Sequence, residues 1–269
     1  FTRSMQLLRD KEPGNKKRFL KVVDTCNAFS SITKLKFIFN GRQFIKYSSH
    51  SEILAAWSNM EQHQWGSGPG AAFMMVTDDK NELFSLGPLM ELNDPGIDGI
   101  EFSFNKDRPL LKPGGYISYR DCKEFFIAAV NSYEAQTAYI HDSDLEQIVS
   151  FGYVSRIIKV QIPKSLWKDI PTPDIVEKIP PALAERLSNV QSPDNFNRLE
   201  IPEAIYWFNY WNPYMVEHVG ESKIKQAPCE VVEKQQNGGY ILVVQKENFD
   251  TGNMEHLERL ARVYDHFDL

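Results

Sequence analysis

The side chains of this sequence that could perform acid–base chemistry are six histidines and the carboxylates beside two of them. His141 is followed by Asp142, and His218 is preceded by Glu217. A carboxylate can orient an imidazole so that the ring acts as a general base. Neighbours in sequence seldom hold that geometry by themselves, so surface polar pairs are the simpler interpretation. A hydrolase that uses scattered His, Asp and Glu residues stays open as an alternative function.

The histidines and cysteines do not have the spacing of a metal site. No HExxH or HxH pattern occurs, and Cys26, Cys122 and Cys229 form no CxxC pair. Three scattered cysteines predict buried free thiols in a reducing compartment. Residues 66–70 (GSGPG) follow a predicted helix and precede a predicted strand, whereas a phosphate-binding loop follows a strand and opens a helix. We therefore expect no catalytic residue, no metal and no cofactor.

The formal net charge of -6 is unevenly distributed along the chain. Residues 1–50 carry 11 basic and 3 acidic side chains, residues 51–150 carry 6 and 16, and residues 151–269 carry 13 and 17. The basic start, with Lys16 and Arg18 near Phe19, raises nucleic-acid binding as a hypothesis. The chain as a whole is acidic, which repels nucleic acid, so no nucleic-acid partner is predicted.

The acidic excess is concentrated in one segment of the middle part. An acidic surface attracts basic proteins, and a solvated acidic loop is the simpler alternative. The residues predicted to bind a partner, on charge alone, are Asp78, Asp79, Glu82, Asp94, Asp98 and Glu101.

Apolar periodicity predicts the elements that would position these residues. The expected elements are helices over residues 16–30, 51–65 and 118–139, a hairpin around Asn40-Gly41, and strands over 71–77, 99–104 and 154–162. Ser51 is expected to cap the second helix, and Ser118 or Asp121 the third.

The second half repeats the order of hairpin and helix. A hairpin is expected around residues 237–239, followed by a helix that Asn253 caps. Residues 204–211 predict a strand, and the aromatic cluster over 206–214 indicates either a strand buried on both faces or a platform for a ligand or partner.

These elements predict an α+β fold with two small antiparallel sheets, each packed by amphipathic helices. The expected division is an N-terminal subdomain over residues 1–160, a Pro-rich connection over 161–200 and a C-terminal subdomain over 201–269. One composite domain is the alternative. No apolar run reaches the roughly 20 residues that span a bilayer, and no export signal is recognisable, so we expect a cytoplasmic protein without a membrane partner.

The second half also resembles a known family. The resemblance rests on residues 205–208 (IYWF), 211–220 (WNPYMVEHVG), 238–245 (GGYILVVQ), 248–250 (NFD) and 253–257 (NMEHL). Together these motifs resemble the immunity protein 52 family of bacterial polymorphic toxin systems. The resemblance implies a cytoplasmic antitoxin of a type VI secretion effector–immunity pair, which binds and neutralises a secreted nuclease-type toxin.

The charge pattern is compatible with that implication. A nuclease needs a positive cleft to hold phosphates, and an acidic protein surface can occupy such a cleft. The expected partner is therefore a cognate toxin with a basic nuclease domain. A general protein-binding adaptor remains a further alternative, and the sequence leaves the oligomeric state open.

Overall fold

The computed structural model describes the chain in two compact units, residues 1–138 and residues 139–269. Within them the described residues are 2–10, 13–29, 34–39, 43–62, 74–77, 85–88, 97–105, 118–149, 174–187 and 204–268, with the single residues 163, 165 and 202. No helix among these residues combines the length and apolar character needed to cross a bilayer.

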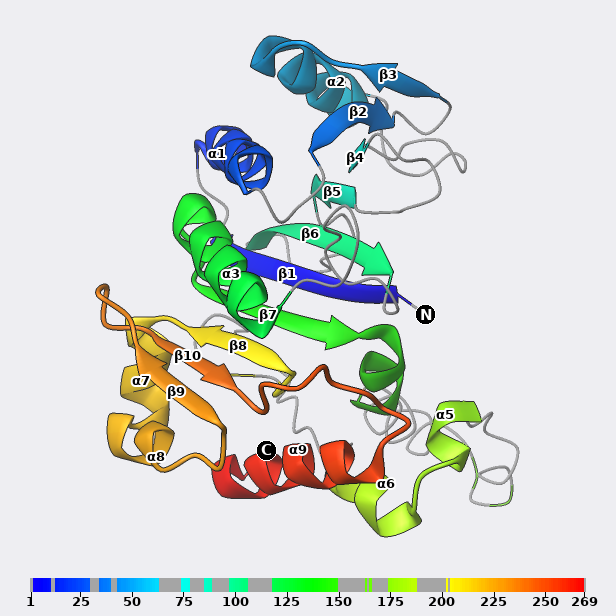
Figure 1. The fold of residues 1–269 in the computed structure, drawn as a ribbon, viewed down its shortest axis with the longest axis vertical. Coiled ribbons are helices and arrows are strands. Elements are labelled where there is room, and N and C mark those ends of the chain that lie inside the picture. Colours follow the sequence, from blue (N-terminus) through cyan, green and yellow to red (C-terminus); the bar gives the residue numbers. More distant parts are fainter. Residues whose placement is uncertain are drawn as a thin grey trace. The chain divides into compact units, whose positions relative to one another are not determined.

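The first unit is built on an antiparallel arrangement of strands. The strands are β1 (Thr2–Asp10), β2 (Leu35–Phe39), β3 (Phe44–Lys46), β4 (Met74–Thr77), β5 (Ser85–Pro88) and β6 (Ile97–Asn105). They follow the order β3-β2-β4-β5-β6-β1 (Figure 1). The longest ladder joins β1 to β6, with Gln6 opposite Glu101 and Arg9 opposite Asp98.

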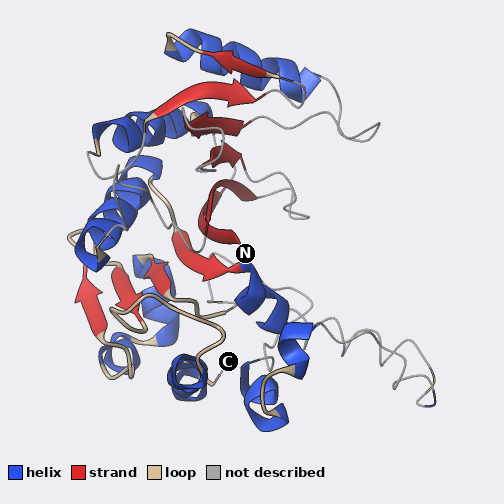
Figure 2. Ribbon diagram, turned by 45° about the vertical axis from the view of Figure 1, so that its right-hand side comes forward, coloured by secondary structure: helices blue, strands red, loops and turns tan. Residues whose placement is uncertain are grey.

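Three helices accompany these strands: α1 (Asn15–Ala28), α2 (His50–Gln62) and α3 (Tyr119–Tyr133). Helices α1 and α3 pack against each other on one side of the strands (Figure 2). Their apolar stripes supply the core, where the ring of Phe125 lies edge-on to Phe102 of β6, at 5.4 Å between centroids. Phe19 of α1 makes a similar contact with Trp57 of α2, at 4.8 Å.

The second unit contains β7 (Thr137–Asp142) for the most part, and β8 (Phe208–Trp211), β9 (Val231–Lys234) and β10 (Tyr240–Val243). Its helices are α5 (Asp174–Glu177), α6 (Pro181–Leu187), α7 (Pro213–Val219), α8 (Glu221–Lys225) and α9 (Met254–Phe267), and residues 143–149 are also helical. All four residues of β8 are buried, which confirms the prediction of a strand buried on both faces. Helix α9 packs on α6, and Phe267 of α9 lies 5.0 Å from the ring of Trp211.

The α+β class is confirmed, but the prediction of two small sheets is wrong. The strands form one ten-stranded order, β3-β2-β4-β5-β6-β1-β7-β8-β10-β9. The order continues because β7 is shared: Thr137 and Ala138 belong to the first unit, and Tyr139 to Asp142 belong to the second. The predicted subdomain boundaries stay a prediction.

Other expectations differ from the structure in detail. The helix expected over 118–139 ends at Tyr133, and its last predicted residues form β7 instead. Ser118 caps α3 by accepting a hydrogen bond from the Asp121 amide, as predicted. Ser51 is the second residue of α2 and not its cap, because Ser49 accepts from the Glu52 amide. The predicted strand over 154–162, the loop 66–70 and the Asn40-Gly41 turn lie outside the described residues.

Candidate functional site

The predicted acidic binding residues are described only in part. Asp78, Asp79, Glu82 and Asp94 lie outside the described residues. Asp98 is placed by its backbone, in β6 opposite Arg9. Glu101 is partly buried on β6, and its carboxylate accepts a hydrogen bond from Gln6 Nε2 at 3.4 Å. The two residues therefore belong to a strand of the sheet, and Glu101 already has a partner from β1.

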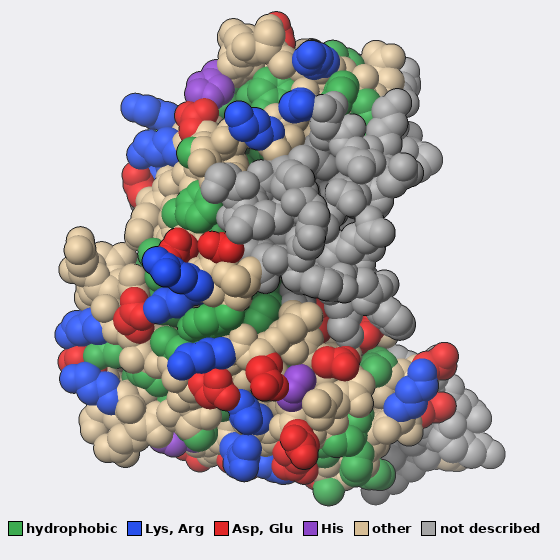
Figure 3. Space-filling model, viewed as in Figure 1, with side chains coloured by type: hydrophobic (Ala, Val, Ile, Leu, Met, Phe, Trp, Pro, Cys, Tyr) green, Lys and Arg blue, Asp and Glu red, His purple; other side chains and the backbone are tan. Residues whose placement is uncertain are grey.

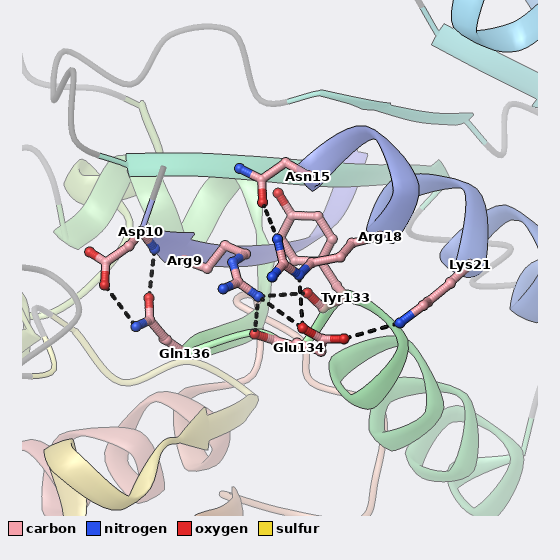
Figure 4. A network of polar contacts seen from close by, with 8 residues as sticks. All are labelled: Arg9, Asp10, Asn15, Arg18, Lys21, Tyr133, Glu134 and Gln136. Atoms are coloured by element: carbon pink, nitrogen blue, oxygen red, sulfur yellow. Dashed lines mark hydrogen bonds and ion pairs between the residues drawn. The ribbon is translucent and has the colours of Figure 1, made fainter. Parts of the chain in front are cut away.

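The basic start of the chain is engaged by a single carboxylate, Glu134 (Figure 4). Arg18 Nε lies 2.8 Å from Glu134 Oε2, and Lys21 Nζ lies 3.0 Å from Oε1. The buried Arg9 approaches the same carboxylate at 3.6 Å and donates to the Glu134 carbonyl at 3.0 Å. One acidic residue thus joins β1 and α1 to the end of α3.

The position of Glu134 is unusual for its type. It ends α3 in the left-handed region, with φ 56° and ψ 44°, where glycine is the common residue. Hydrogen bonds from Arg18 and Lys21 lower the pKa of the Glu134 carboxyl from its ordinary value to about 2. The carboxylate therefore remains ionised, and its attraction for these cations offsets the cost of the backbone conformation.

Lys16 also has partners within the first unit. Lys16 Nζ lies 5.9 Å from the centroid of the Trp57 ring and donates to Ser58 Oγ at 3.3 Å. Lys16, Arg18 and Lys21 of the basic start are consequently held by neighbours from α2 and by Glu134 at the end of α3.

Among the described residues of the second unit, the polar cluster around His141 has the residue types best suited to acid–base chemistry. His141 is only 2% exposed, and its Nδ1 lies 3.6 Å from Glu146 Oε2. Tyr139 and Tyr206 stack on each other at 4.6 Å, and the His141 ring lies 5.2 Å from that of Tyr206. Tyr139 and His141 lie on β7, and Tyr206 lies just before the adjacent strand β8, so the contact joins parts of the chain that are distant in sequence and could not be predicted from spacing.

A second buried contact lies next to this cluster in sequence. Thr251 Oγ1 donates to Asp144 Oδ2 at 3.3 Å, and both side chains are buried. The contact attaches the segment before α9 to the helical residues 143–149. His141 with the Glu146 carboxylate has the composition of a general base, but a base must reach a substrate proton, and a ring with 2% exposure offers little access.

The other histidine with a neighbouring carboxylate, His218 beside Glu217, is exposed. His218 lies on α7, and its ring is 5.3 Å from that of Tyr214, which is 51% exposed. No group of three or more His, Cys, Asp or Glu side chains in the described part of the chain could hold a metal ion.

The cysteines match the expectation of free thiols. Cys26 and Cys122 are buried and Cys229 is half-buried, and all three are unpaired with one another. Burial raises the pKa of Cys26, and it raises that of Cys229 to about 12, so these two thiols are poor nucleophiles.

Charges elsewhere in the second unit are arranged in local pairs, and Figure 3 shows acidic and basic side chains next to one another over its described surface. Arg186 of α6 bridges Glu258 at 2.8 Å and Asp265 at 2.6 Å, both on α9. Glu221 accepts from the Tyr240 hydroxyl at 2.7 Å and from Lys234 at 3.0 Å, and these contacts lower its pKa to about 2. Such pairs stabilise the packing of α6, α8 and α9 modestly.

Comparison with known proteins gives one informative result. No protein-family model matches the chain, and no curated protein matches it. Among solved structures, the fold is similar to that of the T6SS protein PA0821 from Pseudomonas aeruginosa, with a TM-score of 0.53 and 13% sequence identity. The similarity covers 99% of this chain and 72% of that one. At this identity the likeness extends to the fold alone.

Proposed function

We propose that this chain is a cytoplasmic immunity protein, an antitoxin that binds a cognate secreted nuclease-type toxin and neutralises it by direct protein–protein contact. The observation that carries the proposal is the charge distribution. Residues 51–150 contain 16 acidic and 6 basic side chains, while Arg18 and Lys21 of α1 contact Glu134 and Lys16 contacts Ser58 of α2. The middle of the sequence is therefore the most negatively charged part of the chain, and it is the part expected to attract a basic partner.

Two further observations support the proposal. The motifs over residues 205–257 resemble the immunity protein 52 family. The similar structure is named a type VI secretion system protein, which agrees with a role in bacterial competition through toxin–immunity pairs. A basic nuclease cleft attracts an acidic protein, and such steering raises the association rate more than it lowers the dissociation rate.

The toxin is expected to be encoded beside this protein, so the test uses the purified nuclease domain from the neighbouring reading frame. Stoichiometric inhibition and a dissociation constant in the nanomolar range are expected. The double variant Asp94→Lys/Asp98→Lys should lower the association rate about tenfold at low salt, with a smaller effect at high salt.

The matched control is Glu217→Lys/Glu255→Lys, which changes the net charge equally at two exposed residues of the second unit. The proposed acidic segment is refuted if the control slows association as much as the test pair. The immunity function itself is refuted if the wild-type chain neither binds nor inhibits the toxin.

A hydrolase is the second candidate, because His141 lies beside the Glu146 carboxylate. Turnover of a small ester or phosphoester by the wild type, abolished in His141→Gln with the fold retained, would favour it. We expect no such turnover, since the ring is buried.

A further inference from the structure

Strand β3 forms the outer edge of the strand order in the first unit, and it is unusually exposed. Phe44 is 48% exposed and Ile45 is 44% exposed, and Lys46 is exposed as well. The order of the described strands begins at β3, so β2 is its one strand neighbour among them. An exposed edge strand with large apolar side chains is a template for pairing with another chain.

The register shows which backbone groups of β3 point outward. Ile38 lies opposite Ile45, and the Tyr47 amide donates to the Lys36 carbonyl at 3.3 Å. In an antiparallel ladder hydrogen-bonded and non-hydrogen-bonded pairs alternate, so Ile45 bonds toward β2. The N–H and C=O groups of Phe44 and Lys46 therefore point away from β2, toward the side of β3 on which no described strand lies.

The charge of this hairpin restricts what can pair with it. Residues 34–46 contain Lys34, Lys36, Arg42 and Lys46 and no acidic residue. Basic and apolar side chains lie together over the end of the first unit that carries β3 (Figures 1 and 3). Two copies of the hairpin would repel each other, because lysine at an edge disfavours self-pairing.

We propose that β3 is a docking edge for an acidic, extended peptide segment of a partner protein, which adds to the sheet as a further strand. Its backbone meets the outward groups of Phe44 and Lys46, and its carboxylates lie near the lysines of the hairpin. A nucleic acid fits less well, because a phosphate backbone accepts hydrogen bonds but does not donate to the outward carbonyls. This surface is independent of the proposed toxin-binding function.

The test measures binding of a fluorescein-labelled peptide of alternating glutamate and valine to the full chain by fluorescence anisotropy. The wild type should bind it saturably, and Lys46→Glu should weaken binding about tenfold, as reversal of a close charge pair does. Arg262→Glu on α9, an exposed residue of the other unit, is the charge-matched control and should bind as the wild type does.

Two further measurements separate strand addition from simple charge attraction. The bound peptide should slow hydrogen exchange of the Phe44 and Lys46 amides, and a peptide N-methylated at alternate residues should bind at least tenfold more weakly. The proposal is overturned by absence of saturable binding at millimolar peptide, by equal binding of the N-methylated peptide, or by equal loss in Arg262→Glu. Tighter binding of a single-stranded oligothymidylate, or a dimer that forms through β3, would also overturn it.

Discussion

Replacing Glu134 with glutamine should loosen the attachment of α1 to α3. The substitution keeps the shape of the side chain and removes its charge, so the ion pairs with Arg18, Lys21 and Arg9 become ordinary hydrogen bonds or are lost. The backbone conformation at residue 134 is unchanged, since glutamine and glutamate tolerate the left-handed region equally poorly.

The expected loss follows from the carboxyl pKa and its exposure. A fall in pKa from 4.5 to about 2 would correspond to about 3 kcal/mol without solvent screening. Because the side chain of Glu134 is 49% exposed, screening reduces this contribution, and we expect a loss of about 1.5 kcal/mol.

The pH dependence has a defined sign. The folded pKa of Glu134 lies below its unfolded value, so its contribution is complete above about pH 4.5 and disappears as the pH falls through about 2. The difference in opening free energy between wild type and Glu134→Gln should therefore be largest near pH 7 and vanish near pH 2.

Native-state hydrogen exchange of the α1 and α3 amides is the suitable assay, because a chain with two units does not have a single free energy of unfolding. Glu124→Gln is the control, since the Arg120–Glu124 pair at 2.8 Å lies on α3 and is largely exposed. Its loss should not exceed about 0.5 kcal/mol. An effect of Glu134→Gln no larger than that, or one that grows toward low pH, would refute the reasoning.

Two other substitutions probe the second unit. A Cβ on Gly239 would lie 2.7 Å from the Trp211 carbonyl oxygen, so Gly239→Ala should force the β9–β10 hairpin to shift and lower the melting temperature, at a cost of about 1–3 kcal/mol. The Tyr264 hydroxyl accepts from the Ile205 amide at 3.1 Å and donates to its carbonyl at 3.2 Å, so Tyr264→Phe should lower the urea midpoint of the second unit's transition, at a cost of about 1–3 kcal/mol. A thermally neutral Gly239→Ala, or a Tyr264→Phe variant with an unchanged midpoint, would contradict these geometries.

The sequence was sufficient for elements whose apolar residues follow a regular period. Helices α1, α3 and α9 each bury one stripe, and Ser118 and Asn253 cap the last two with side-chain oxygens. The hairpin of β9 and β10 was likewise predictable from the Asn237-Gly238 pair. Glycine tolerates the positive φ that such a turn requires, and Gly238 adopts φ 88°.

Strands β1 and β7 could not be read in the same way. Leu7, Leu8 and Arg9 of β1 are all buried, so the strand lacks the alternation that marks a half-exposed strand. Helix α3 is followed by Glu134, which adopts a left-handed conformation before β7 begins. Neither glycine nor proline, the usual sequence signals for the end of a helix, is present there. The apolar pattern therefore predicts a helix through residue 139, although α3 ends at Tyr133 and β7 begins at Thr137.

The site was less predictable than the fold because its contacts join distant parts of the sequence. Glu134 meets Arg18 across 116 residues, and Asp144 meets Thr251 across 107. The basic residues of α1 suggest a nucleic-acid surface in the sequence, because the carboxylate that reaches Arg18 and Lys21 lies 116 and 113 residues away from them along the chain. Asp78, Asp79, Glu82 and Asp94 of the predicted acidic face lie outside the described residues, so the prediction for these four stands on charge alone.

The Glu134 contacts connect stability with the proposed function. A carboxylate that only ended a helix could be replaced by glycine at an advantage, because glycine adopts the left-handed region without strain. Glu134 adds attraction for Arg18 and Lys21, and in doing so it cancels positive charge on the surface of an otherwise acidic protein. A protein that competes with nucleic acid for a basic cleft gains from that cancellation, because uncompensated cations would repel the cleft it has to enter. The same side chain therefore serves the packing of α1 on α3 and, under the proposed function, preserves the negative charge that would attract a basic toxin.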